Sequence, residues 1–263
     1  MSIGIKEVQS FWDSRPCNIK HSPLPVGSIE YFNEVEIRKY FVEPHIPGFA
    51  DFPQWKNKKV FEVGCGIGTD AVNFARNGAD YTGIDLSHES VKITQDRLNT
   101  FGLPGKVFQA NAEEISNSFQ GTKFDLIYSF GVLHHTPDMD SALTSLRSLM
   151  NNQSVLKVML YAKNSWKSAM IDAGLDQPEA QYGCPIANTF TREEVRFIFA
   201  RAGLKVDSIG QEHIFPYKID EYKNYKYELQ PWFKAMPKEV FSALEKSLGW
   251  HLLISASIAN QNS

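Results

Sequence analysis

Cysteine is scarce in this sequence, and long apolar runs are missing. The 263 residues include Cys17, Cys65 and Cys184 without a CxxC pair, so no disulfide framework is expected. No apolar stretch approaches the roughly 18 residues that a membrane-spanning helix needs. The first residues also lack the basic start and apolar run of a secretory signal. We therefore expect a cytoplasmic protein without a membrane span.

A strong charge of either sign is absent as well. The formal net charge is -3, which gives no global field toward nucleic acid or anionic lipid and weakens an RNA or DNA substrate. No HxxxH, CxxC or carboxylate cluster has metal-ligand spacing, so no metal is expected. The length and the 43% hydrophobic content suit one large domain with insertions. Nothing in the composition specifies an oligomeric state.

From Lys58 onward, apolar β runs alternate with amphipathic helical segments. Strands are expected over 58–63, 80–86, 106–110, 124–130, 154–162, 204–210 and 251–258. Helices are expected over 69–78, 87–98, 138–150 and 191–201. Strands that alternate with helices in this way predict parallel pairing with right-handed crossovers.

Three stretches depart from that alternation. Residues 1–50 form an irregular prelude, in which a helix is expected from residue 30 until Pro44 ends it. We interpret this prelude as an N-terminal cap segment and residues 51–263 as the main domain. Within that domain, 163–190 and 211–249 are read as substrate-cap insertions, because pocket-forming insertions in a doubly wound sheet lie over the carboxyl ends of the strands. Decoration away from the site is the alternative.

A glycine-rich loop, VGCGIGT, joins the first expected strand to a helix. Gly64, Gly66 and Gly68 have GxGxG spacing, and Thr69 stands where a dinucleotide fingerprint requires glycine. Glycine lets the backbone approach a ligand closely, and the helix N-terminus offers free N–H groups. Asp85 ends the second strand, where a carboxylate can bind both hydroxyls of a ribose. Its alternative role is a turn former or helix cap.

Residues 58–162 resemble class I S-adenosylmethionine-dependent methyltransferases. VFEVGCGIGTDAVNFARNGADYTGIDLS looks like their first motif and following strand, NAEE (111–114) like the next motif, and FDLIYSFGVLHHTPD (124–138) like the fourth strand. The most similar subgroup includes ubiquinone/menaquinone-type and natural-product small-molecule methyltransferases. The resemblance implies a Rossmann-like, doubly wound α/β fold with seven strands, mostly parallel, the last antiparallel. It also implies in-line methyl transfer from S-adenosylmethionine to O, N or C of a small molecule, leaving S-adenosylhomocysteine.

The resemblance assigns roles at the cofactor. Glu62 would orient the glycine loop and reach the methionine amino group, and Asp85 would hold the ribose. Leu86 would pack on the adenine. Asn111 stands where the family usually has aspartate, and its side-chain carbonyl can still accept from the adenine amino group. The further cofactor candidates are Gly64, Cys65, Gly66, Gly68, Ala112, Glu113 and Phe130.

Other residues are candidates for a catalytic base, for binding the methionine carboxylate and for binding the acceptor. His134 and His135 lie beside the expected methyl group, and either can serve as a base or, alternatively, bond the loop and cap the next helix. The guanidinium of Arg38 can bind the methionine carboxylate in bidentate geometry. The alternative is that Arg38 lies on a solvated helix face. The acceptor candidates are Trp12, Tyr31, Tyr217 and Tyr222. The segment 213–238, rich in tyrosine and lysine, is read as a substrate lid, with a packed insertion, an oligomer surface or a nucleic-acid or membrane face as alternatives.

Two other functions remain open on the sequence. One is a cofactor-binding module whose catalysis has decayed. The other is a methyltransferase that acts on RNA or protein, although the chain has no Asn-Pro-Pro-Tyr-type motif for base amino groups.

Overall fold

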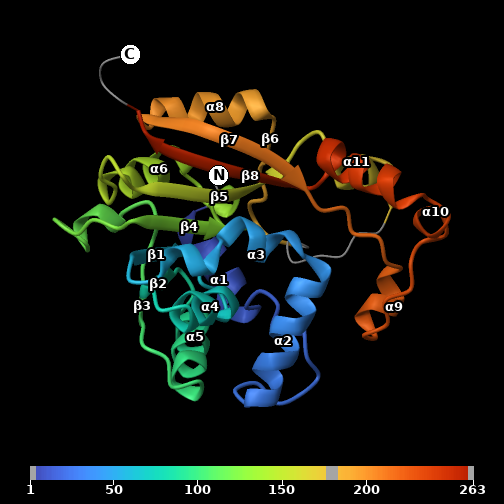
Figure 1. Cartoon of the computed structure of the whole chain (residues 1–263), viewed down its shortest axis with the longest axis horizontal. Helices are drawn as coiled ribbons and strands as arrows, with labels where there is room; N and C mark the ends of the chain where they lie inside the picture. Colours follow the sequence, from blue (N-terminus) through green and yellow to red (C-terminus); the bar gives the residue numbers. More distant parts are fainter. Residues whose placement is uncertain (1–3, 176–182, 260–263) are drawn as a thin grey trace.

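The computed structural model describes residues 4–175 and 183–259. The strands are β1 Lys59–Val63, β2 Asp80–Asp85, β3 Lys106–Gln109, β4 Leu126–Phe130, β5 Val155–Ala162, β6 Thr189–Phe190, β7 Leu204–Glu212 and β8 His251–Ile258. They form one sheet in the order β3-β2-β1-β4-β5-β8-β7, and the two-residue β6 pairs with β5 (Figure 1). Seven predicted strands are therefore confirmed, and β6 is an addition that the sequence did not indicate.

The helices of the main domain follow the predicted alternation. They are α4 Thr69–Arg76, α5 His88–Thr100, α6 Met139–Ser148 and α8 Arg192–Arg201. Ser87 caps α5 by accepting from the backbone of Ser90, and Thr191 with Glu194 forms the capping box of α8. These caps satisfy helix N–H groups that would otherwise lack a partner, which is why both helices begin where the sequence predicts.

The strand directions also agree with the prediction. β1 pairs in parallel with β2 and β4, and β4 pairs in parallel with β5. β8, the last strand, is antiparallel to both β5 and β7. The carboxyl ends of the parallel strands therefore meet at one edge of the sheet, where a ligand site is expected in this fold class.

Alternate residues of the strands build a core on each face of the sheet. Phe61 and Ile127 join one buried cluster, which continues into α6 and α8. Val60, Leu126 and Tyr128 point the other way, into a second cluster with α4 and Leu98 of α5. This two-sided burial explains why the central strands read as nearly continuous apolar runs.

The prelude and the insertions carry helices of their own. They are α1 Ile5–Ser14, α2 Ile29–Val42, α3 His45–Ala50, α7 Trp166–Asp172, α9 Ile219–Lys223, α10 Pro231–Lys234 and α11 Lys238–Leu248. The single turns η1 Phe52–Trp55, η2 Ile115–Asn117 and η3 Leu133–His135 belong to the main domain. In Figure 1, α9, α10 and α11 lie beyond the ends to which β5 and β7 point. Residues 176–182 of the first predicted insertion lie outside the described residues. No helix within 4–175 or 183–259 is long and apolar enough to cross a membrane.

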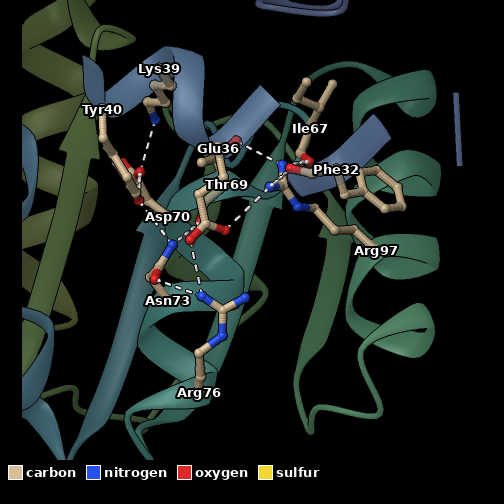
Figure 2. A network of polar contacts seen from close by, with 10 residues as sticks. All are labelled: Phe32, Glu36, Lys39, Tyr40, Ile67, Thr69, Asp70, Asn73, Arg76 and Arg97. Atoms are coloured by element: carbon tan, nitrogen blue, oxygen red, sulfur yellow. Dashed lines mark hydrogen bonds and ion pairs between the residues drawn. The ribbon is translucent and has the colours of Figure 1, made fainter. Parts of the chain in front are cut away.

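A buried arginine fastens the prelude to the glycine loop. Arg97 of α5 donates to the carbonyls of Phe32 and Ile67 and to the hydroxyl of Thr69, as Figure 2 shows. Its side chain is fully buried. Asp70, the second residue of α4, accepts from Lys39 of α2 at 2.8 Å. Charged groups seldom lie inside a protein unless they are paired, so these contacts fix α2 against the start of α4.

Candidate active site

The glycine loop after β1 has the conformation that only glycine adopts easily. Gly64, Gly66 and Gly68 have φ angles of 76°, 55° and 78°. A Cβ on Gly64 would lie 2.2 Å from a methyl carbon of Val132, whereas one on Gly66 would meet nothing within 4 Å. Gly64 is therefore needed for close backbone packing, and Gly66 leaves open the space in front of the loop.

Asp85, at the end of β2, faces this loop. Its Oδ2 accepts from the Gly66 N–H at 2.9 Å, and its Oδ1 accepts from the Ser87 N–H at 2.8 Å. Each carboxylate oxygen has a second lone pair, so both can also accept from a ligand. Burial raises the pKa of Asp85 to about 6, against the lowering effect of these two N–H groups.

A first cavity, which we call the small cavity, lies in front of the loop and Asp85. Nine of the predicted site residues line it, namely Trp12, Gly64, Gly66, Asp85, Leu86, Asn111, Ala112, Phe130 and His135. The structure thus brings together side chains from α1, from four strand ends and from η3.

Four other predicted site residues line neither this cavity nor its larger neighbour. Gly68 is the N-cap of α4, and the Glu113 carboxylate accepts from the Asp138 N–H. Tyr31 is fully buried and donates to the Ile19 carbonyl. His134 is fully buried with its ring 3.7 Å from that of Tyr161. These four residues make contacts within the protein, and their ligand roles stay predictions.

His135 is the histidine of the predicted pair that reaches the small cavity. Its Nδ1 is hydrogen-bonded to the Ile186 carbonyl. A carbonyl only accepts, so Nδ1 carries the proton and Nε2 keeps its lone pair. Burial lowers the pKa of His135 to about 4, so the ring is neutral at pH 7. The ring of Trp12 packs edge-on against it at 5.2 Å.

A second, larger cavity adjoins the first. The two share the wall residues Trp12, Cys17, Gly64, Gly66, Phe130, Gly131 and Tyr161. The remaining predicted site residues line the large cavity, namely Arg38, Glu62, Cys65, Tyr217 and Tyr222. Its wall includes Trp166, Phe233 and Trp250 in addition, so the surface is strongly aromatic.

Glu62 lies at the bottom of the glycine loop, where the large cavity begins. It accepts from the Tyr81 hydroxyl at 2.6 Å. Burial raises the pKa of the Glu62 carboxyl above its usual range, and the nearby Asp70 carboxylate raises it further. An ammonium group placed against Glu62 would restore its charged form, which suits an amino-group partner.

Arg38 contacts the segment 213–238 rather than the glycine loop. Its guanidinium donates to the Tyr222 carbonyl at 2.7 Å and lies 4.1 and 4.3 Å from the ring centroids of Tyr222 and Tyr225. These contacts tie α2 to the segment 213–238 across the large cavity. The contact with a ligand carboxylate stays a prediction, and Lys39, one residue on, also lines this cavity.

Several cavity residues were not singled out from the sequence. Tyr161, Glu43, His213 and His251 belong to the cavity walls. They lie far apart in the chain, with no common motif, and come together only through the packing of α2 and β8 on the sheet. The one local signal was the position of Tyr161 near the carboxyl end of a predicted strand.

Comparison with known proteins agrees with this geometry. The ubiquinone biosynthesis O-methyltransferase of Actinobacillus pleuropneumoniae serotype 5b is 33% identical over 102 residues, 38% of this chain and 44% of that protein. Its counterpart in Chromobacterium violaceum is 34% identical over 93 residues, 35% of this chain and 40% of that protein. The chain thus matches less than half the length of these curated relatives.

A solved structure shares the fold over nearly the whole chain. Magnesium protoporphyrin IX methyltransferase from Synechocystis PCC 6803 with bound SAH has a TM-score of 0.63 and 14% identity, covering 97% of this chain and 99% of its own. At that identity the likeness establishes the fold alone. Residues 35–209 match the family model described as a methyltransferase domain. Since this match includes the glycine loop, Asp85 and the sheet from β1 to the start of β7, the chain belongs to the methyltransferase domain family.

Proposed function

We propose that this protein transfers the methyl group of S-adenosylmethionine to a small-molecule acceptor held in the large cavity. The observation that carries the proposal is the wall that the two cavities share. Gly64, Gly66 and Phe130 border both spaces. A cofactor in the small cavity therefore presents its reactive end to a molecule in the large one.

The positions of these residues support one orientation for the cofactor. The adenine would lie between Leu86 and Asn111, and the ribose hydroxyls would donate to Asp85. The methionine end would extend past Gly64 toward Glu62, at the boundary with the large cavity. The sulfonium would then lie near Phe130 and Gly131. Asp85 is the one carboxylate among the described residues that line the small cavity.

Methyl transfer requires that nucleophile, methyl carbon and sulfur lie in line, so positioning supplies much of the rate. The aromatic wall of the large cavity suits a planar or partly apolar acceptor. His135 lines the small cavity with Nδ1 bonded to the Ile186 carbonyl, so Nε2 is the nitrogen that would receive a proton from an acceptor reaching past Phe130 and Gly131 in the shared wall. Cys17, Cys65 and Cys184 are unpaired, which suits the reducing cytoplasm that we propose as its location.

The cofactor claim is tested by calorimetry with S-adenosylmethionine and S-adenosylhomocysteine. We expect micromolar binding, and a loss of about 10- to 100-fold in Asp85→Ala, because two charge-assisted hydrogen bonds disappear. Asp80→Ala, at the exposed start of the same strand, is the matched control and should bind as the wild type does. A folded wild type that binds neither compound would contradict the proposal. Release of S-adenosylhomocysteine with acceptor fractions separates an enzyme from a decayed binding module.

The pH dependence of binding gives an independent check. Only the charged Asp85 carboxylate accepts from both ribose hydroxyls, and its pKa is raised by burial to about 6. Protonation then removes an acceptor, so Asp85 should make the Kd rise by up to ~10-fold per pH unit below its pKa. The Glu62 carboxyl, whose pKa burial also raises, adds a pH dependence that an Asp85 variant retains. Titrations of the wild type and Asp85→Asn with S-adenosylhomocysteine from about pH 5 to about pH 8 separate the two contributions. Asp85→Asn should bind more weakly and lose the rise of Kd below about pH 6, and identical profiles for the two proteins would argue against the ribose role.

A further inference from the structure

Three potential metal ligands meet on the wall of the large cavity, apart from the cofactor contacts. Glu43 directly follows α2, His213 directly follows β7, and His251 begins β8. Each offers one ligand atom, and among the described residues these atoms lie within 4.8 Å of one another. All three side chains line the large cavity. Three separate elements thus direct a carboxylate and two imidazoles to one point.

A fourth residue orients one of these imidazoles. Nδ1 of His251 lies 2.9 Å from Nε2 of His45, a hydrogen bond between two ring nitrogens. With the proton on Nδ1 of His251, its Nε2 lone pair is free on the side of Glu43, whose Oε1 is 3.7 Å away. That distance is too long for a hydrogen bond. A histidine that binds a metal commonly donates its other N–H to a neighbour in this way.

The backbone at His213 is unusual. Its φ angle is 79°, in the left-handed region that residues other than glycine seldom occupy. The His213 carbonyl accepts from the Trp250 N–H at 2.7 Å, which fixes this turn against the start of β8. The two rings of His213 and His251 consequently lie 4.5 Å apart between centroids. Strained residues of this kind gather at functional sites.

We propose that Glu43, His213 and His251 bind a divalent transition-metal ion of the zinc or iron(II) class. Two imidazole nitrogens and one carboxylate oxygen suit these ions, and three protein ligands leave a coordination position for a further molecule. Ligand atoms around a tetrahedral zinc ion are about 3.3 Å apart. The 3.7 Å between Glu43 and His251 is close to that spacing, and rotation of the His213 side chain supplies the remaining approach.

The proposed ion lies where it can activate an acceptor hydroxyl, and this role rests on the proposed methyl transfer. The Phe130 ring lies 5.5 Å from that of His251, and Phe130 also lines the small cavity. An acceptor hydroxyl on the open position would therefore lie on the methyl side of the ion. Coordination lowers the pKa of a bound hydroxyl, which loses its proton to water. The oxygen then bonds to the methyl carbon, and the C–S bond breaks with its electron pair going to sulfur.

Metal binding is measured on the full chain after treatment with a chelator. We expect calorimetry with Zn²⁺ to give one site, and Co²⁺ to give the visible absorption of a low-symmetry complex. Glu43→Gln and His213→Asn should each weaken binding at least ~10- to 100-fold, as expected when a metal site loses one of its groups. Asparagine tolerates the left-handed backbone, so His213→Asn retains the turn. His88→Gln, an exposed histidine on α5, is the control and should bind as the wild type does.

Two results would overturn the site. One is a folded wild type that does not bind Zn²⁺ or Co²⁺, and the other is unchanged binding by both ligand variants. Binding of S-adenosylhomocysteine to the same metal-free protein reports on the proposed function separately. Metal binding without cofactor binding would overturn the proposed function and leave the metal site standing, and the reverse pattern would do the opposite.

Discussion

Gly64→Ala is expected to lower both the free energy of unfolding and the affinity for the cofactor. The new Cβ would lie 2.2 Å from a methyl carbon of Val132, and the φ angle of 76° disfavours any side chain. The left-handed backbone costs about 1–2 kcal/mol and the overlap about 1–3 kcal/mol, which gives a loss of roughly 2–5 kcal/mol. Denaturant unfolding and calorimetry with S-adenosylhomocysteine measure the two effects.

Variants of two other glycines separate the cost of the left-handed backbone from the cost of the overlap with Val132. Gly102→Ala places a Cβ in open space at a φ angle of 62°, so it reports the backbone cost alone. Gly66→Ala also meets nothing within 4 Å, but this residue lines both cavities. Its stability should fall by about 1–2 kcal/mol, as for Gly102→Ala, while its cofactor affinity falls with that of Gly64→Ala. If Gly64→Ala proves no less stable than Gly102→Ala, the packing of Val132 against the loop is not what requires glycine there.

Arg97→Met is expected to detach the prelude from the glycine loop. The guanidinium is fully buried, and its removal leaves the Phe32 and Ile67 carbonyls and the Thr69 hydroxyl without this donor (Figure 2). Breaking a buried charged network by removing one partner typically costs about 3–5 kcal/mol. Cofactor binding should weaken too, because Ile67 and Thr69 belong to the loop and to the first turn of α4.

Arg76→Met is the matched control. Arg76 reaches the same prelude helix through Glu36 at 3.0 Å, but its side chain is 42% exposed. Exposed ion pairs contribute about 0–1 kcal/mol, so this variant should unfold close to the wild type. Chemical denaturation of the two variants compares their free energies of unfolding. Equal stability in Arg97→Met and Arg76→Met would show that the buried contacts do not hold α2 in place.

The sheet was predictable because its signals are local. Apolar runs, the caps at Ser87 and Thr191, and glycine at 78 mark the ends of elements within a few residues of where the structure has them. The prelude was harder, since its residues pack on partners far away in sequence. In the helix predicted from residue 30, the apolar Ile37 is 70% exposed, while the charged Arg38 beside it is buried against tyrosines from the segment 213–238.

The same distinction applies to the site. The proposed cofactor side comes from one stretch, from β1 to η3, whose motifs predicted eight wall residues of the small cavity, while the ninth, Trp12, comes from α1. The acceptor side is assembled from α1, α2 and the segments around β8. Glu43 and His251 are 208 positions apart, and no spacing rule connects them. Only the pairing of β8 with β5 and β7, together with the end of α2, brings them to one cavity.

This division has a consequence for how such proteins diversify. The residues that match the methyltransferase domain model run from 35 to 209, whereas Trp12, Cys17, His213 and His251 lie outside that range and still line the large cavity. Mutations in the flanking segments can therefore reshape the large cavity, where we propose that the acceptor binds, while the glycine loop and Asp85 stay as they are. A lineage with this architecture can acquire a new substrate without passing through an ancestor that had lost its cofactor.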